Sequence, residues 1–174
     1  MFLLIVYGLT ESMGSIINLC DKEFISGDVG QVAPNMELKI IDLQTGNALP
    51  PNQDGEICIR GPIMFKGYLN NPEATAATID KNGWLHTGDI GHYNEQRHLF
   101  ITDRIKELIK FKGYSVPPAE VEDLLLRHEA IKEAAVVGVP HKTDTQWLRA
   151  YVTLKDGYHV DAADIKKYVE GNFK

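Results

Sequence analysis

The segment near the start of the chain carries residue types that could hold a nucleotide. Tyr7 offers an aromatic ring for stacking, Gly8 permits close backbone approach, and Thr10 adds a hydroxyl. Glu11 could bind Mg²⁺, a hard cation that prefers oxygen ligands and usually shares them with phosphates. A second interpretation is a strand end at which Thr10 or Ser12 caps the next element.

A second candidate is Asp89, which follows Thr87 and Gly88 in a predicted loop after the turn signal Asn82-Gly83. The two oxygens of a carboxylate can each accept one O–H donor, so this residue could bind the vicinal diol of a ribose. Thr-Gly-Asp is also a frequent turn sequence, and the tripeptide alone favours a structural role.

A third candidate is the segment from Asp103 to Lys112, which contains four cations in ten positions. If the segment is extended, side-chain alternation predicts one cationic and one apolar face. The cationic face could attract a nucleotide or coenzyme phosphate; lysines that protect an edge strand from aggregation are the alternative, and composition favours it. The cationic face would carry Arg104, Lys106, Lys110 and Lys112, and the apolar face Ile105, Ile109 and Phe111.

The elements that must position these residues change in character along the chain. The apolar run 2–6 predicts a buried strand, the loop 7–12 follows it, and a second apolar stretch covers 16–19. From Gly27 to Asp103 short strand-like pieces at 37–43, 55–60 and 98–102 alternate with Gly, Pro and Asn clusters, which indicates a β-rich region. One helix interrupts it: Asn71 is its predicted cap, Pro72 its first residue, and Ile79 its approximate end.

The elements expected after Gly113 indicate a compact α+β unit, and we predict that this unit begins near Arg104. Strands are expected at 134–139 and 148–154. The pair Pro117-Pro118 opens a helix with Val121, Leu124 and Leu125 on one face. Asp161 is the predicted cap of a last helix, in which Ile165, Tyr168 and Val169 face inward and Gly171 marks the end.

Composition excludes several classes of protein. The 174 residues carry a net charge of −6, which argues against nucleic acid as a partner because such binders normally present a basic face. The two cysteines, Cys20 and Cys58, form no CxxC pair, so neither a disulfide framework nor a zinc site is predicted and a reducing, intracellular location fits. The apolar opening is shorter than the roughly 20 residues that a membrane helix needs, so we predict no transmembrane segment.

Taken together and in order, four blocks of the sequence resemble the acyl-adenylate-forming (AMP-binding) superfamily. The resemblance is greatest to its 4-coumarate-CoA ligase and luciferase-like acyl-CoA synthetases. It covers nearly the whole chain from Tyr7 onward. The blocks are YGLTE at 7–11, GEICIRG at 55–61 with Gly67-Tyr68, GWLHTGD at 83–89, and DRIKELIKFKGY at 103–114 continuing through VPPAEVE.

The resemblance implies specific roles for the residues of the nucleotide site. Tyr7, next to Gly8, would stack against adenine, and Thr10 would contact the phosphate of the adenylate. Glu11 would help to hold Mg²⁺, and Asp89 would bind the ribose hydroxyls.

For the segment after residue 103 the resemblance implies a mobile small domain. Arg104 corresponds to a ribose-contacting arginine, and Lys106 to the hinge about which the small domain swings. Lys110 corresponds to a lysine used in thioester formation, and Gly113 to a glycine along the path of the pantetheine arm.

The implied fold is α/β and α+β. Residues 1–103 would form the C-terminal part of the large AMP-binding domain, residues 104–106 the hinge, and residues 107–174 an incomplete small domain. The family's phosphate loop and its Gly-Lys adenylation motif have no counterpart in the sequence. We therefore expect a fragment that is inactive alone.

The implied reaction joins a carboxylic acid to coenzyme A through an acyl-AMP, with ATP and Mg²⁺. Two alternatives are a non-catalytic remnant that binds nucleotide or coenzyme A, and part of a luciferase-like monooxygenase. Members of this family often carry a peroxisomal signal, so a peroxisomal or cytoplasmic location is expected; no oligomeric state is implied.

Overall fold

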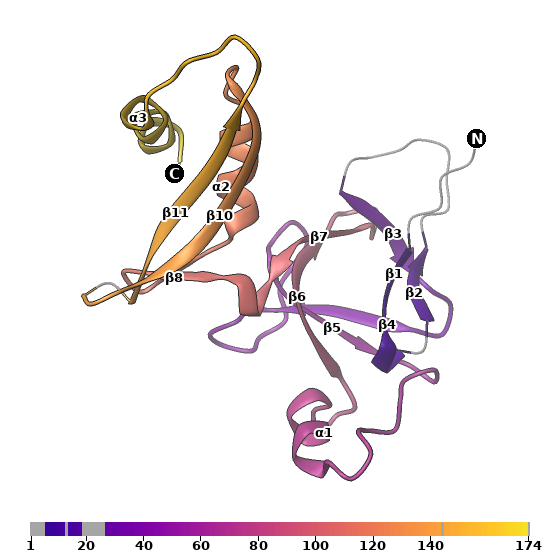
Figure 1. Cartoon of the computed structure of the whole chain (residues 1–174). Coiled ribbons are helices and arrows are strands. Elements are labelled where there is room, and N and C mark those ends of the chain that lie inside the picture. Colours follow the sequence, from indigo (N-terminus) through magenta and orange to yellow (C-terminus); the bar gives the residue numbers. More distant parts are fainter. Residues whose placement is uncertain (1–5, 13, 19–26, 144, 174) are drawn as a thin grey trace. The chain divides into compact units, whose positions relative to one another are not determined.

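The computed structural model describes residues 6–12, 14–18, 27–143 and 145–173. The chain divides into two compact units, Met1–Ile105 and Lys106–Lys174. The division falls inside the segment 104–106 that the sequence marked as a hinge. Figure 1 follows the chain through both units, and each is described separately below.

The first unit is a β-sheet unit, as the alternation of short strands with turn residues predicts. Its described part forms a seven-stranded antiparallel sheet in the order β1-β2-β3-β7-β6-β5-β4. The strands are β1 (Val6–Leu9), β2 (Gly14–Asn18), β3 (Asp28–Val32), β4 (Glu37–Ile41), β5 (Gly55–Arg60), β6 (Leu85–Tyr93) and β7 (Leu99–Arg104). The strands predicted at 37–43, 55–60 and 98–102 are confirmed as β4, β5 and β7.

The sequence was wrong about residues 7–9, which were expected in a loop. Tyr7 pairs with Ile17 in the β1–β2 hairpin, so it lies in a strand. The chain turns only afterwards, in a 3₁₀ turn, Thr10–Ser12. The buried Ser12 hydroxyl accepts the Leu9 N–H at 3.1 Å and donates to the Leu9 carbonyl at 2.8 Å, which closes this turn. Most of the predicted strand 2–6 lies outside the described residues.

The core of the first unit is centred on β5. Ile57, Cys58 and Ile59 are three consecutive residues with no exposed surface, so both faces of this strand are covered. Ile40, Leu85 and Leu99 from the neighbouring strands are each 1% exposed. The site-bearing strand β6 therefore rests directly against a packed strand.

The helix predicted after Asn71 is confirmed as α1 (Pro72–Thr78). Oδ1 of Asn71 accepts the Ala74 N–H at 3.0 Å, which satisfies one of the free amides of the first turn. Pro72 occupies a first-turn position where its missing N–H costs nothing.

The second unit is the predicted α+β unit. Within the described residues, its sheet has the order β10-β11-β8-β9, and Figure 1 shows β10 and β11 as two long strands side by side. Its elements are β8 (Ile109–Phe111), β9 (Tyr114–Val116), α2 (Pro118–Leu126), β10 (Ile131–His141), β11 (Thr145–Leu154) and α3 (Ala162–Asn172).

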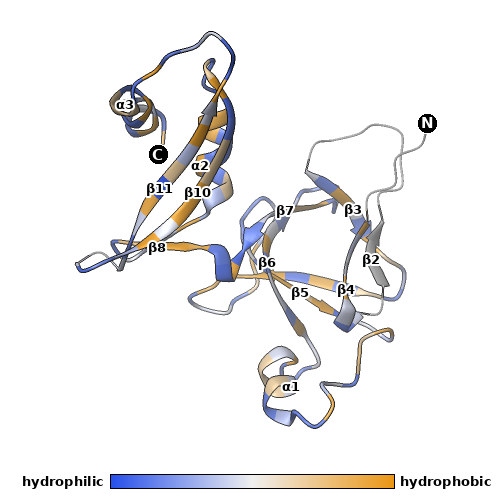
Figure 2. Cartoon of the chain, viewed as in Figure 1, coloured by the Kyte–Doolittle hydropathy of each residue, from blue (hydrophilic) through white to orange (hydrophobic). Residues whose placement is uncertain are grey.

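Side-chain alternation on β10 and β11 builds the core of this unit. Val136 is 5% exposed and faces the helices, whereas its neighbour Val137 is 44% exposed on the other face. Both apolar and polar residues therefore occur along these two strands in Figure 2. Val121 and Leu125 of α2 pack onto the apolar face as predicted, and Ile165 and Val169 of α3 join them.

Two details of the last helix differ from the prediction. Asp161 stands at the N-cap position, but its side chain makes no capping hydrogen bond. The helix also continues through Gly171 to Asn172, because Phe173 closes it with its own N–H on the Val169 carbonyl.

The condition for a cationic face, an extended segment from Asp103 to Lys112, is not met. A 3₁₀ turn, Ile105–Glu107, separates β7 from β8. Leu108 and Ile109 are consecutive and both buried, at 7% and 2% exposed, which strict alternation in one strand would not allow. The cations of this segment therefore do not share one strand face.

Among the described residues, no helix has the length and apolar character needed to cross a membrane.

Thr145 begins β11 with a φ of 65°, in the left-handed region that β-branched residues avoid. We predict that Thr145→Gly raises the free energy of unfolding by about 1 kcal/mol, since a left-handed L-residue costs roughly 1–2 kcal/mol and glycine loses part of this gain to chain entropy. Urea unfolding of the chain measures the change. Thr145→Asn, which tolerates this φ better than threonine, should gain less; equal stability of all three proteins would contradict the strain.

Candidate functional site

The candidate site is built around the carboxylate of Asp89 on β6. Asp89 is 5% exposed, and both of its oxygens are hydrogen-bonded. Oδ2 accepts the Tyr7 hydroxyl at 2.8 Å, and Oδ1 accepts Nε–H of Arg104 at 3.0 Å. A carboxylate has about four acceptor positions, so each oxygen retains capacity for one further donor. Residues 7, 89 and 104, singled out separately in the sequence, therefore meet at one carboxylate.

The prediction that Asp89 lies in a loop is wrong, because the residue lies inside β6, whose pairing with β5 shifts register between Glu56 and Cys58. The start of β6 is held in place from β5. Thr87 Oγ1 donates to the Ile57 carbonyl at 2.8 Å and accepts the Asp89 N–H at 3.1 Å. Glu56 adds a second connection, because its Oε1 accepts the Gly88 N–H at 3.3 Å and its Oε2 lies 2.8 Å from His86 Nδ1. Gly88 has a φ of 72°, which glycine adopts without strain. These bonds fix the backbone that presents Asp89.

Tyr7 reaches the carboxylate from β1. The ring is 8% exposed and packs in the core cluster of the first unit. Burial raises the pKa of the Tyr7 phenol well above its ordinary value, and the neighbouring Asp89 raises it further. The hydroxyl therefore stays protonated and serves Asp89 as a donor.

Arg104 is the last residue of β7 and lies directly opposite Asp89 in the β6–β7 ladder. Its side chain is 49% exposed, whereas that of Asp89 is 7% exposed. Solvent therefore screens the guanidinium end of the pair, and the remaining N–H groups of Arg104 are accessible to a ligand. The Arg104 backbone N–H donates to Asp103 Oδ1 at 2.7 Å, which fixes the strand end.

Thr10 and Glu11 lie in the 3₁₀ turn that follows β1, three and four residues after Tyr7. Thr10 is exposed and Glu11 is half-buried. The Glu11 carbonyl accepts the Phe65 N–H at 2.7 Å, and Glu11 Oε1 accepts the Tyr68 hydroxyl at 2.7 Å. The fold thus places a hydroxyl and a carboxylate beyond the strand that carries Tyr7. Gly8 directly follows Tyr7 on β1 and is exposed.

The remaining predicted residues belong to the second unit. Lys106 lies in the 3₁₀ turn after β7 and Lys110 on β8. The Lys110 ammonium donates to Ser115 Oγ at 2.5 Å across the β8–β9 hairpin, and its backbone N–H donates to Gln146 Oε1 at 2.7 Å. Gly113 closes this hairpin with a φ of 86°, where an added Cβ would meet open space.

Glu56, Cys58 and His86 form a cluster in which one potential metal ligand from each lies within 4.8 Å of the others. The Cys58 sulfur is 3.7 Å from His86 Nδ1. Burial raises the pKa of the Cys58 thiol to about 12, and the Glu56 charge adds to the effect. A thiolate ligand is therefore disfavoured, and the bonds of Glu56 to His86 and Gly88 explain the cluster as a support for the start of β6.

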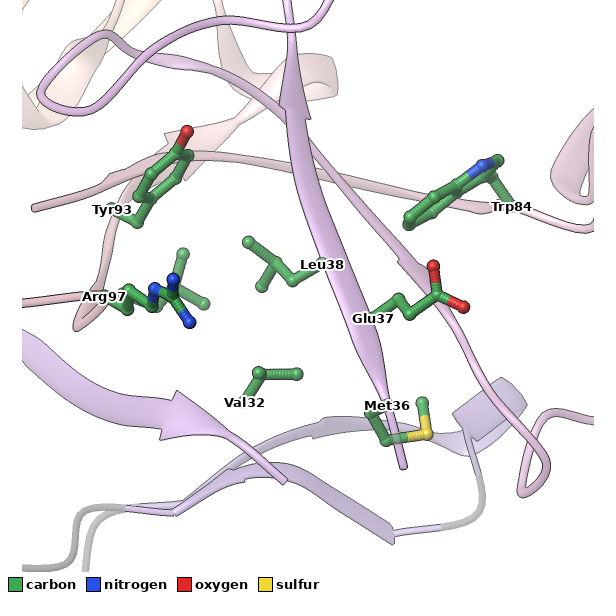
Figure 3. A pocket seen from close by; sticks show the side chains of 8 residues that line it. Val32, Met36, Glu37, Leu38, Trp84, Tyr93 and Arg97 are labelled. Atoms are coloured by element: carbon green, nitrogen blue, oxygen red, sulfur yellow. The ribbon is translucent and has the colours of Figure 1, made fainter. Parts of the chain in front are cut away.

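A separate cavity of about 380 Å³ opens on the first unit. Figure 3 shows Tyr93 and Arg97 toward one end and Glu37 and Trp84 toward the other, with Leu38 between them. None of the predicted site residues lines it. The cavity is therefore distinct from the Asp89 site, and its Glu37 side chain pairs with Arg60 at 2.6 Å.

Sequence reasoning missed three residues that touch the site: Glu56, Thr87 and Tyr68. All three lie within or beside the blocks that carried the resemblance. Their roles depend on contacts 30 to 57 residues away in the chain, which no local pattern encodes.

Comparison with known protein families gives two matches. The family model described as "AMP-binding enzyme" matches residues 1–69, and "AMP-binding enzyme C-terminal domain" matches residues 120–174. Curated relatives include 4-coumarate–CoA ligase 5 from Oryza sativa subsp. japonica, 50% identical over 169 residues, and luciferin 4-monooxygenase from Photinus pyralis, 48% identical over 163 residues. Each alignment covers 94% of this chain, which spans 31% and 30% of the two relatives.

Solved structures give the same result. ATP-bound MatB from Rhodopseudomonas palustris matches with a TM-score of 0.89 and 31% identity, over 99% of this chain and 34% of that one. The o-succinylbenzoate coenzyme A synthetase MenE from Bacillus subtilis, in complex with AMP, matches with a TM-score of 0.75 and 33% identity, over 98% and 34%.

The burial of Cys58 gives a testable outcome. At pH about 8 only about one thiol in ten thousand with a pKa near 12 is ionised, and thiolate is the reactive form. In a Cys20→Ser variant, we expect Cys58 to react with iodoacetamide about 100-fold more slowly in the folded chain than in urea. Equal rates in both conditions would show that Cys58 is accessible and ionised in the folded state.

Proposed function

The chain belongs to the AMP-binding enzyme family, and from this membership we propose that it functions as part of an ATP-dependent acid–thiol ligase. The proposed reaction activates a carboxylic acid as an acyl adenylate and then transfers the acyl group to coenzyme A. Two classes of similar protein support this choice, the 4-coumarate–CoA ligases and the coenzyme A synthetases. The chain spans about 30% of the length of its curated relatives, so we propose the activity for an enzyme that contains this chain.

The single observation that carries the proposal is the Asp89 carboxylate, buried but still able to accept further hydrogen bonds. A ribose diol supplies two O–H donors at the spacing of the two carboxylate oxygens. Tyr7 and Arg104 hold those oxygens in place before the nucleotide arrives, so binding need not order the carboxylate. We assign Asp89 and Arg104 to the ribose.

The neighbouring turn suits the phosphate end of the nucleotide. Thr10 is exposed and offers a hydroxyl donor, and Gly8 allows close approach to β1. We assign Thr10 to the phosphate of the adenylate. Tyr7 is assigned to the adenine side, where its buried ring would present only a limited surface for stacking.

The Glu11 side chain is chemically suited to Mg²⁺. Its carboxylate is a hard oxygen donor, and Mg²⁺ usually combines one or two such carboxylates with phosphate oxygens. Bound Mg²⁺ would neutralise charge on the phosphates of ATP. Within the proposal, Glu11 holds the cation and the Asp89 group holds the ribose.

For the second step we assign Lys110 and Gly113. The thiol of coenzyme A would attack the acyl carbon and lose its proton to solvent; a C–S bond forms, the C–O bond to phosphate breaks, and AMP leaves with the electron pair. A positioned ammonium stabilises the negative charge that develops on oxygen in such a transfer. Gly113, in the β8–β9 turn, has no side chain, and the space beside its Cα is open. A narrow pantetheine arm could pass there. Lys106, at the start of the second unit, is assigned to the hinge.

A luciferase-like monooxygenase is the second candidate, because luciferin 4-monooxygenases are as similar to this chain as several of the ligases. A non-catalytic role in binding nucleotide or coenzyme A is the third. Formation of an acyl-CoA from ATP, coenzyme A and a panel of carboxylates would support the ligase. Light emission with luciferin and oxygen would support the monooxygenase, and binding without turnover would support the non-catalytic role.

We further propose an intracellular location, peroxisomal or cytoplasmic, which is consistent with the free thiol of Cys58.

The ribose assignment predicts that Asp89→Asn weakens AMP binding about tenfold or more. The amide loses the charge-assisted bonds to the ribose, and a hydrogen bond to a charged group is worth about 1.5–3 kcal/mol. Calorimetric titration with AMP measures the effect. Asp54→Asn is the matched control, since Asp54 pairs with His92 of the same strand away from the site. Equal weakening by both variants would contradict the assignment.

The thioester assignment predicts a step-specific defect for Lys110→Ala in an active enzyme that contains this chain. Loss of one positioned cation costs on the order of 3 kcal/mol, so acyl transfer from acyl-AMP to coenzyme A should slow about a hundredfold while adenylation is largely spared. Single-turnover assays separate the two steps. Lys112→Ala removes a cation from the same hairpin and should leave both steps nearly unchanged; an equal fall of both steps in Lys110→Ala would refute the role.

A further inference from the structure

Glu11 is held at two points by a segment of chain more than 50 residues away. The Phe65 N–H donates to the Glu11 carbonyl at 2.7 Å, and the Tyr68 hydroxyl donates to Glu11 Oε1 at 2.7 Å. The first bond fixes the backbone and the second fixes the side chain. Together they define where the carboxylate lies relative to β1.

Tyr68 is itself anchored, so its hydroxyl is a fixed point. Its backbone N–H donates to Thr75 Oγ1 of α1 at 2.9 Å, and its carbonyl accepts the Asn71 N–H at 3.2 Å. The ring packs edge-on against Phe65, with ring centroids 4.9 Å apart. These contacts connect the phenol to the capped start of α1.

The close packing before Tyr68 requires glycine. Gly67 has a φ of 140°, and a Cβ at this position would lie 2.7 Å from the Thr75 methyl group. Any larger residue would push the segment away from α1 and move the phenol with it. The Gly67-Tyr68 pair and Thr75 therefore act together to place the hydroxyl.

The arrangement leaves one carboxylate oxygen for a ligand. Within the part of the chain that the structure describes, Glu11 Oε2 has no hydrogen-bond or ion-pair partner. A carboxylate whose orientation is fixed through one oxygen binds a cation through the other without losing rotational freedom on binding.

We propose that Tyr68 is a positioning residue for Mg²⁺: its hydroxyl orients the Glu11 carboxylate, which binds the cation through Oε2. The inference rests on the proposed function, which assigns Mg²⁺ to Glu11. A purely structural role, in which the bond only ties the segment to the sheet, would affect nucleotide binding equally with and without the cation. The dependence on Mg²⁺ therefore separates the two roles.

The experiment measures the dissociation constant for ATP by calorimetry, once in EDTA and once in saturating Mg²⁺. Tyr68→Phe keeps the ring and its contact with Phe65 but removes the hydroxyl. We expect the gain in ATP affinity from Mg²⁺ to fall about tenfold in this variant, the lower end of effects seen when a group that orients a metal ligand is removed. The affinity in EDTA should be unchanged.

Two further proteins sharpen the test. Tyr93→Phe removes a phenolic hydroxyl that donates to the Leu49 carbonyl in the same unit, and it should keep the full Mg²⁺ gain. In a Glu11→Gln background the gain should be lost, and adding Tyr68→Phe should have no additional effect. That non-additivity is expected only if the two residues act through one interaction.

The other outcomes are equally informative. An unchanged Mg²⁺ gain in Tyr68→Phe, or an equal loss of affinity in EDTA and in Mg²⁺, overturns the positioning role. Wild-type ATP binding that ignores Mg²⁺ overturns the metal role of Glu11 and this inference but leaves the ribose site intact. Absence of ATP binding by the wild-type chain overturns the proposed function itself.

Discussion

A buried negative charge organises the first unit. The side chain of Asp89 is 7% exposed, and a desolvated carboxylate costs several kcal/mol unless donors surround it. The fold supplies those donors from two other strands of the sheet: the Tyr7 hydroxyl from β1 and the Arg104 guanidinium from β7. The β1–β2 hairpin and the last residue of β7 must both be in place for this charge to be tolerated. The same requirement assembles the candidate ribose site.

A second layer of polar contacts supports the charged one. Glu56 and Thr87 join the start of β6 to β5, whose residues 57–59 are fully buried. A site held by a packed strand keeps its geometry better than one held by a free loop. Glu11 has an equivalent support in Tyr68, which is anchored on α1. Polar side chains thus fix the backbone that presents the Asp89 carboxylate, and one of them fixes the Glu11 carboxylate directly.

The division of the chain at Ile105 and Lys106 separates the residues that we assign to the nucleotide from those that we assign to acyl transfer. The first unit carries the acidic side chains and hydroxyls suited to ribose, phosphate and Mg²⁺. The second carries Lys110 on a small hairpin closed by Gly113, with its ammonium engaged by Ser115. Membership of the AMP-binding enzyme family is the basis on which both sets of residues are assigned to one proposed reaction.

The sequence alone determined the family, the limits of β5, the start of α1 and the apolar face of α2, because each depends on neighbouring residues: a capping Asn71, a first-turn Pro72 or a run of apolar positions. Only the tertiary structure decided that Tyr7 lies in a strand, that Tyr68 reaches Glu11, and that a 3₁₀ turn breaks the cationic segment. These outcomes depend on the pairing of Tyr7 with Ile17, on the contact between Tyr68 and Glu11, which are 57 positions apart, and on the burial of both Leu108 and Ile109. Local periodicity carries no information about such pairings, because sheet order and core packing are properties of the whole chain.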